Sequence, residues 1–383
     1  MKKVAITSLL ISGFFLGFYF GEINKYNRKI PEVLRISPTQ AKKQSNKVAV
    51  KSRSIFVPSW SLKSENKELS NYDELIYFGI TPDYLGINKN ETGYYGIPIF
   101  LKLAEGKKKL ITLRMIDDDL NYFILGNKQL QKKIIQQTLE IVEQNKFDGV
   151  VLDLEISGLY SQDLTNQINN FAQLFYSEVN KNYRQFYLAI YGDNFFRKRP
   201  FDLSVLTRNS DGIMIMAYDF HKSRGEPGPN FPYDSGVRYQ YNFKKMISDF
   251  SKVVAKEKIT VIFGMFGYDW LVDEKKRPIR QAEALSLNQI AEKFFGTSLK
   301  RSSQTYTTDV KCYWQDCVIK RDLISKETEI NYVVSAEKPD DQDIYRIDYH
   351  IVWFEDEESV KIKTDYLREQ GISNISYWAN GYF

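Results

Sequence analysis

The chain has 383 residues, of which 43% are apolar and 15% aromatic, so it can bury a sizeable core and is not an intrinsically disordered protein. Its 53 basic and 48 acidic side chains leave a net charge of only +5. No dense basic block lies beside stacking aromatic residues, which argues against nucleic acid as a partner.

The amino terminus has the pattern of an export signal. Lys2 and Lys3 precede an apolar run over residues 4–20. No small-x-small cleavage site follows, which favours an uncleaved anchor, but the run is shorter than the about 20 residues that usually span a bilayer, so a cleaved signal stays open. The two lysines favour export of the rest of the chain. We therefore expect a signal anchor or signal peptide over 1–21, a polar spacer over 22–53, and an extracytoplasmic domain that contacts the membrane only through this N-terminal segment.

From residue 54 onward, strand-like segments alternate with helix-like ones. The helices show apolar residues every three or four positions, as over residues 128–144 and 164–180. The strands are short apolar runs that end in turn residues, at 54–60, 74–80, 110–116, 147–155, 186–191, 212–218, 260–265 and 372–378. Eight such units predict an α/β fold, a (β/α)8 TIM barrel over residues 54–383. No glycine-rich phosphate loop follows the first strand, which argues against a dinucleotide-binding sheet.

One segment, at about 273–349, interrupts this alternation. It is too long for a loop and includes a strand-like run at 329–334, which predicts a small α+β insertion between strands 7 and 8. Cys312 and Cys317 are the only cysteines, and a disulfide and two free thiols both remain open for them. Two cysteines without a nearby histidine do not form a metal site.

The strand at 147–155 ends in two acids. Successive side chains of a strand point to opposite faces, so Asp153 and Glu155 share one face with Val151. Burial of an acid costs free energy, so a buried acid at this position is expected to have a function. The alternative is a strand that simply ends in solvated acids. In barrel enzymes the working groups lie at the carboxyl ends of the strands. The residues that fall there are Asp153, Glu155, Tyr218, Asp219 and Trp378.

These residues resemble a known family. Residues 148–155 are similar to the signature strand of family 18 glycoside hydrolases, which reads Asp-Gly-x-Asp-x-Asp-x-Glu. Asp148, Gly149, Asp153 and Glu155 match it, whereas Val151 replaces the middle acid. Residues 216–219 are similar to the family's Met-x-Tyr-Asp signature on the sixth strand, and Trp378 resembles the tryptophan under the reacting sugar. Residues 266–270 and 352–359 look like the branch of spore-germination N-acetylglucosaminidases.

The resemblance implies an exported, chitinase-like hydrolase of β-linked N-acetylglucosamine polymers, either peptidoglycan or chitin-like glycans. In this family the substrate's own N-acetyl group attacks the sugar carbon, with retention of configuration. Glu155 would be the general acid and then the base, Asp153 would bind the acetamido N–H, and Tyr218 would donate to the acetamido oxygen. The residues expected to bind the sugar are Asp219, Trp378, Met216, Trp60 and Tyr268.

No cofactor and no metal are expected, because the only histidines, His221 and His350, do not form a ligand-spaced pair. A rival hypothesis is a carbohydrate-binding protein on the same barrel that is catalytically weak or inactive. The presence of Glu155 favours a hydrolase, and the presence of Val151 favours the carbohydrate-binding protein. We expect Val151 to slow turnover without abolishing it, because the proton donor and the acetamido-binding groups remain. The choice between chitin and peptidoglycan, endo or exo action, and the oligomeric state stay open.

Overall fold

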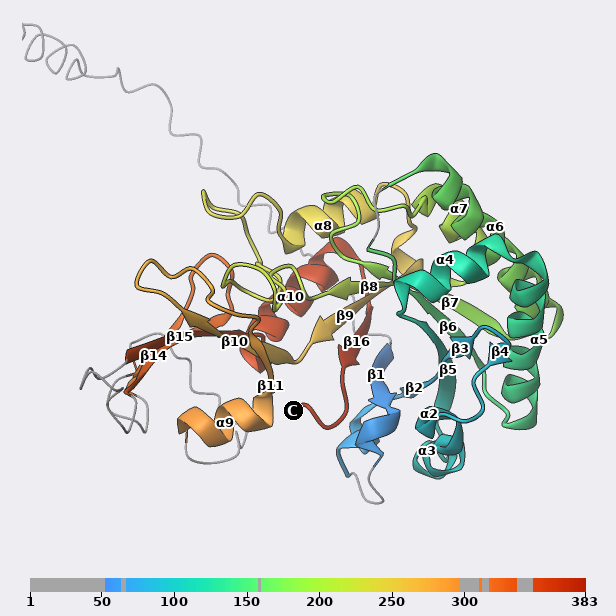
Figure 1. Ribbon diagram of the computed structural model, residues 1–383, viewed down its shortest axis with the longest axis horizontal. Helices are drawn as coiled ribbons and strands as arrows, with labels where there is room; N and C mark the ends of the chain where they lie inside the picture. Colours follow the sequence, from blue (N-terminus) through green and yellow to red (C-terminus); the bar gives the residue numbers. More distant parts are fainter. Residues whose placement is uncertain (1–51, 63–66, 158–159, 296–309, 312–316, 336–346) are drawn as a thin grey trace, which may run out of the picture. The chain divides into compact units, whose positions relative to one another are not determined.

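The computed structural model describes residues 52–62, 67–157, 160–295, 310–311, 317–335 and 347–383. Eight parallel strands close into a barrel in the order β1-β16-β9-β8-β7-β6-β5-β2 (Figure 1). Their bounds are β1 Ser52–Pro58, β2 Glu74–Ile80, β5 Lys108–Met115, β6 Gly149–Leu154, β7 Gln185–Tyr191, β8 Gly212–Ala217, β9 Ile259–Gly264 and β16 Asn374–Trp378. Each coincides with one of the eight predicted strands, so the (β/α)8 prediction is confirmed.

Helices follow most of the barrel strands. They are α2 Thr92–Tyr95, α3 Ile97–Leu103, α4 Asp118–Gly126, α5 Lys128–Gln144, α6 Gln162–Lys181, α7 Leu203–Leu206, α8 Phe243–Phe250 and α10 Glu357–Gln370. A short hairpin of β3 (Pro82–Asp83) and β4 (Gly86–Ile87) lies between β2 and α2. Among the described helices, α5 and α6 are the longest, and each is preceded by an N-cap residue, Asn127 or Ser161, whose side chain accepts a hydrogen bond from a backbone N–H of the first turn.

The alternation along β6 divides its side chains between two apolar layers. Val150, Leu152 and Leu154 belong to the large core between the strands and the helices. Val151 belongs to a smaller cluster that fills the inside of the barrel, together with residues of other strands such as Met214 and Met216. The same alternation places Asp153 on the inward face, as the sequence predicted.

The first two matching residues of the signature strand have a structural role. The Asp148 carboxylate accepts a hydrogen bond from the backbone N–H of Lys109, 2.8 Å away, and ties the start of β6 to β5. A Cβ on Gly149 would lie 2.3 Å from the carbonyl oxygen of Gln185 on β7, so only glycine fits. Both residues lie at the end of the strand opposite Glu155.

The insertion is a second sheet with strand order β11-β10-β15-β14-β13-β12. Its elements are β10 Phe266–Val272, β11 Glu283–Ser286, α9 Leu287–Phe295, β12 Val310–Lys311, β13 Cys317–Arg321, β14 Thr328–Ser335 and β15 Ile347–Phe354. The sheet thus occupies 266–354, which is wider than the predicted 273–349, because residues 266–272 already pair with β11 and β15. Cys317 is disulfide-bonded, whereas Cys312 lies outside the described residues.

The predicted signal segment at 1–21 and nearly all of the spacer at 22–53 lie outside the described residues; β1 begins at Ser52. Within the part of the chain that the structure describes, no helix is both long and apolar enough to cross a membrane.

Candidate active site

Glu155 follows the last residue of β6 and is partly exposed at the carboxyl end of the barrel. The Tyr191 hydroxyl on β7 donates a hydrogen bond to Glu155 Oε2 over 2.9 Å. Burial raises the pKa of Tyr191, with a further contribution from the Glu155 charge, so the hydroxyl stays protonated and remains a donor. The Asn121 side chain on α4 donates to the backbone oxygens of Glu155 and Met115, at 2.8 Å each. Glu155 is therefore held through both its side chain and its backbone.

Asp153 lies on the same face one step deeper and is only 4% exposed. Its Oδ1 atom is buried and has no hydrogen-bond partner among the described residues. Burial raises the pKa of Asp153 well above its usual range, the nearby Glu155 charge raises it further, and Arg114 opposes the shift. Asp153 therefore keeps its proton to a higher pH than an ordinary aspartate does.

Tyr218 and Asp219 directly follow β8. Burial raises the pKa of the Tyr218 hydroxyl, and the charges of Asp153 and Glu155 add to the shift, so Tyr218 is a hydrogen-bond donor. Asp219 has a φ of 57°, a left-handed conformation that few residues other than glycine adopt. Its backbone N–H donates to Asn230 Oδ1 over 2.7 Å, and its Oδ1 accepts from the Tyr268 hydroxyl over 2.8 Å. Tyr268 comes from β10, so the inserted sheet supplies a side chain to this site.

Trp378, the last residue of β16, is partly exposed and lies at the centre of an aromatic group. Its ring centroid lies 4.6 Å from Phe78, 5.6 Å from Phe56 and 6.5 Å from each of Tyr218 and Trp60. Trp60 is 56% exposed, the most open ring of this group. Such an exposed aromatic surface suits stacking on a sugar face.

One predicted site residue, Met216, and the departure from the family pattern, Val151, lie in the barrel interior. Met216 is 6% exposed and packs in the inner apolar cluster, so little of its side chain is open to a sugar. Val151 is fully buried in the same cluster. In the strand register, Val151 pairs with Thr112, whose buried hydroxyl oxygen has no partner among the described residues. An apolar residue thus occupies the position below Asp153 where the family pattern has an acid.

Arg114 is a positively charged neighbour of Asp153 and lowers its pKa. It lies on β5 directly opposite Asp153 in the strand register. Its guanidinium lies 4.6 Å from the Phe78 ring centroid and 5.4 Å from that of Trp60, and it makes a 3.6 Å ion pair with Glu91. Arg114 therefore joins the acidic pair to the aromatic group.

Sequence reasoning did not identify Tyr191, Arg114, Asn121 or Asn230. Tyr191 ends a predicted strand, so its place at a carboxyl end was a usable signal. Arg114 required the register of β5 against β6, and Asn230 required a contact across a loop. The described residues contain no group of three His, Cys, Asp or Glu side chains placed to hold a metal ion.

A closed eight-stranded barrel with a buried acid, a second acid at the strand end and an aromatic floor defines the class of glycoside hydrolases with a barrel catalytic domain. Residues 19–382 match the family model described as glycosyl hydrolases family 18. The chain therefore belongs to this family.

Two relatives illustrate the similarity in sequence. The chain is 22% identical over 274 residues to the uncharacterized glycosylase YvbX of Bacillus subtilis, covering 69% of this chain and 66% of that protein. It is also 22% identical over 269 residues to the cortical fragment-lytic enzyme of Bacillus anthracis, covering 69% of this chain and 53% of the relative. The matches thus span about half to two thirds of the length of these proteins.

Two solved structures share the fold. The Bacillus cereus spore cortex-lytic enzyme SleL has a TM-score of 0.62 at 19% identity, with 88% of this chain and 72% of that chain covered. A Group IV chitinase of Ostrinia furnacalis, in complex with allosamidin, has a TM-score of 0.65 at 14% identity, with 86% and 91% covered.

The raised pKa of Asp153 predicts how stability depends on pH. Because the folded protein binds the Asp153 proton more tightly than the unfolded chain, this group destabilises the fold increasingly as pH rises above its unfolded pKa of 3.8. Asp153→Asn should therefore gain stability relative to the wild type as pH rises from 4 to 7. Urea unfolding at several pH values measures this, with Asp119→Asn at an exposed position as the control. An equal pH dependence in Asp153→Asn and the wild type would contradict the assignment.

Proposed function

We propose that the chain hydrolyses β-linked N-acetylglucosamine polymers by a retaining mechanism in which the substrate's N-acetyl group is the nucleophile. The observation that carries this proposal is the pair of acids on one strand face, with Asp153 buried, and its pKa raised, below the partly exposed Glu155. Because Asp153 holds its proton more tightly than an ordinary aspartate does, the two carboxyl groups differ and can take different roles.

In the first step, the proton of the pair moves from Asp153 to Glu155 as the acetamido N–H of the substrate binds Asp153. Glu155 then protonates the glycosidic oxygen, the C1–O bond breaks, and the acetamido oxygen bonds to C1 to give an oxazolinium ion. The Asp153 carboxylate stabilises the positive charge of this ion. In the second step, the Glu155 carboxylate removes a proton from water, the water oxygen attacks C1, and the acetamido group is released. Two inversions at C1 give net retention.

The other site residues position the sugar in this mechanism. The protonated Tyr218 hydroxyl donates to the acetamido oxygen and directs it toward C1. The Trp378 ring is the floor of the subsite, and Trp60 extends it toward solvent. Tyr191 orients the Glu155 carboxylate through the 2.9 Å hydrogen bond. A site of this kind is preorganised, because the contacts that hold its side chains exist before the substrate binds.

Peptidoglycan is the first candidate substrate. Two of the similar proteins carry the names cortical fragment-lytic enzyme and spore cortex-lytic enzyme, which supports a cell-wall glycan. The similar chitinases support chitin oligomers as the second candidate. Both polymers contain the 2-acetamido group that the mechanism requires.

The proposed location is outside the cytoplasm, at the membrane or secreted. The basic start and the apolar run over residues 4–20 support it. Immunoblotting of membrane, soluble and medium fractions from cells that make the full chain tests the location. Recovery in the cytoplasmic fraction alone would contradict it.

The catalytic proposal predicts that Glu155→Gln lowers product release by about 10²- to 10⁴-fold, the usual contribution of general acid–base catalysis. The assay is release of reducing ends from N-acetylglucosamine oligomers and from purified peptidoglycan. Glu143→Gln, at an exposed position of α5, is the matched control and should keep full activity. If the wild type and Glu155→Gln bind the oligomers equally but neither releases product, the rival carbohydrate-binding function replaces this proposal.

A second prediction concerns Val151. Replacement by Asp restores the acid that the family pattern places below Asp153, and we expect turnover to rise on the order of tenfold, equivalent to about 1.4 kcal/mol. Stability should fall, because a carboxyl group enters an apolar interior. Val151→Asn is the control of similar size without an ionisable group, and it should show no gain. Equal kcat values for the wild type and a folded Val151→Asp would count against this explanation of Val151.

A further inference from the structure

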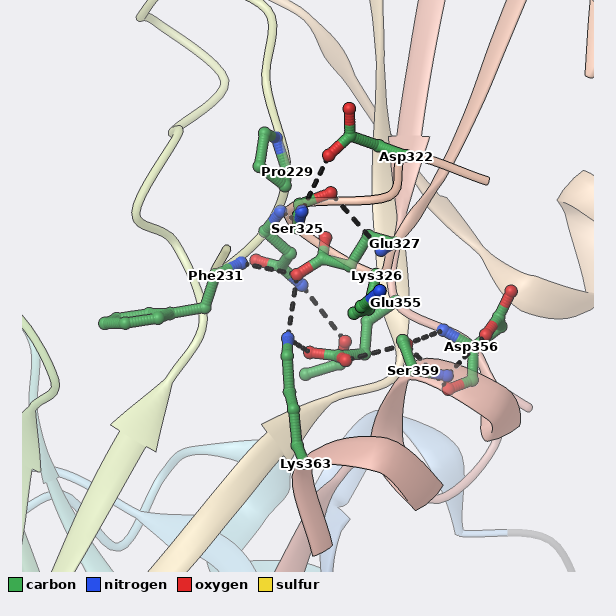
Figure 2. Close-up of polar contacts among 12 residues, drawn as sticks. Pro229, Phe231, Asp322, Ser325, Lys326, Glu327, Glu355, Asp356, Ser359 and Lys363 are labelled. Carbon is green, nitrogen blue, oxygen red and sulfur yellow. Dashed lines mark hydrogen bonds and ion pairs between the residues drawn. The ribbon is translucent and has the colours of Figure 1, made fainter. Parts of the chain in front are cut away.

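Three ionisable side chains lie together in the interior, away from the acidic pair. Glu327 precedes β14, Glu355 follows β15, and Lys363 lies on α10, each with an exposed fraction of 0%. Figure 2 shows Lys363 directed at both acids; its Nζ atom lies 2.8 Å from Glu327 Oε1 and 2.7 Å from Glu355 Oε2. Full burial of charged groups is rare unless they are paired and hydrogen-bonded. The cluster of Glu327, Glu355 and Lys363, here called the buried triad, therefore needs an explanation.

One acid of the triad has a raised pKa. Burial raises the pKa of Glu355; Lys363 opposes this shift and Glu327 adds to it, and the resulting pKa is about 8. Glu355 therefore carries a proton near pH 7. The Ser359 hydroxyl also contacts Glu355, 2.8 Å from its Oε1. The partners of Glu355 thus belong to the triad and to α10.

Glu327 differs from Glu355, because it also binds the loop that follows β8. Its Oε2 accepts a hydrogen bond from the backbone N–H of Asn230 over 2.5 Å, and its Oε1 accepts one from that of Phe231 over 2.8 Å. The contact with Phe231 is visible in Figure 2. Nearby, the backbone N–H of Tyr233 donates to the oxygen of Ser325 over 3.0 Å. The turn between β13 and β14 is therefore docked on the loop after β8.

Asn230 carries this contact to the active site. Its Oδ1 accepts from the backbone N–H of Asp219 over 2.7 Å, and its Nδ2 donates to the Gly264 oxygen at the end of β9 over 3.0 Å. Its backbone oxygen accepts from the N–H of Phe220 over 2.8 Å. These bonds surround Asp219, whose φ of 57° is unfavourable without such support. A continuous chain of hydrogen bonds thus leads from Lys363 through Glu327 and Asn230 to Asp219.

We propose that Glu327 and Lys363 are positioning residues for the sugar-binding turn at Tyr218 and Asp219, and that the inserted sheet completes the active site by supplying Glu327. The inference rests on the proposed hydrolase function. Lys363 holds the Glu327 carboxylate, the carboxylate holds two successive backbone N–H groups, and Asn230 fixes the turn. Tyr268 from the same sheet holds the Asp219 carboxylate from the other side.

The test uses the full chain and two substitutions within the triad. Glu327→Gln removes the charge that binds Lys363 and both backbone N–H groups, whereas Glu355→Gln mimics the protonated Glu355 and leaves those two groups bound. We expect Glu327→Gln to lower kcat/KM for N-acetylglucosamine oligomers by about 10- to 100-fold, as expected for a small misplacement of a site group. Glu355→Gln should remain within about twofold of the wild type. Equal activity of folded Glu327→Gln and Glu355→Gln would overturn the proposal.

A double-mutant cycle separates positioning from general stability. In an Asn230→Ala background, Glu327→Gln should have little further effect on kcat/KM, because its effect reaches the turn through the Asn230 side chain. If the loss of kcat/KM in the double variant equals the product of the losses in the two single variants, the proposal is contradicted. If Glu327→Gln does not fold, the double variant Glu327→Gln/Lys363→Met removes the charge imbalance and is the second test, since replacing a whole buried ion pair is often tolerated. A folded double variant with wild-type kcat and KM would overturn the proposal.

Oligomer binding, followed by tryptophan fluorescence, distinguishes failure of this inference from failure of the proposed function. If the wild type binds but does not hydrolyse, the hydrolase proposal fails, and weaker binding by Glu327→Gln than by Glu355→Gln would still support the positioning role. If the two variants bind equally, the positioning role fails, whatever the activity of the wild type. A wild type that neither binds nor hydrolyses would overturn both.

Discussion

The burial of Asp153 is the constraint on which the rest of the site depends. A closed barrel has an inside and an outside, and the alternation of side chains along β6 directs Asp153 inward and the neighbouring leucines outward. The inside of this barrel is apolar below Asp153, and its Oδ1 has no hydrogen-bond partner among the described residues. Loss of its proton is therefore costly, and burial in the fold raises the pKa of Asp153.

Residues outside the barrel strands complete the proposed site. The barrel alone provides the two acids, Tyr218 and Trp378. The inserted sheet adds Tyr268, which holds the Asp219 side chain, and Glu327, which holds the loop that supports the Asp219 backbone. Because β10 starts two residues after β9 ends, the sheet begins at the carboxyl end of the barrel, where these groups lie. With the proposed role of Glu327, the insertion and the barrel form one functional unit.

The sequence was sufficient for the barrel and for the residues at its strand ends. Each barrel strand is a short apolar run, so its position and type depend mainly on local pattern. Because the functional groups of barrel enzymes lie at the carboxyl ends of the strands, the strand positions also identify Asp153, Glu155, Tyr218 and Trp378 as site residues. Contacts between residues far apart in the sequence could not be predicted. Asn230 and Glu327 are 97 positions apart, and the proximity of Arg114 to Asp153 depends on the register in which β5 pairs with β6. The start of the insertion at Phe266 was missed for a similar reason, because β10 is defined by its pairing with β11 and β15.

In the proposed mechanism, the substrate's acetamido group is the nucleophile. The most direct test compares hydrolysis of one β-linked oligomer with and without the N-acetyl group on the sugar whose C1–O bond is cleaved. Substrate-assisted hydrolysis predicts release of product from the acetylated oligomer and none from its de-N-acetylated form or from a plain glucan of the same linkage. Efficient hydrolysis of the glucan would contradict the account, because Asp153 and Tyr218 would then have no acetamido group to act on.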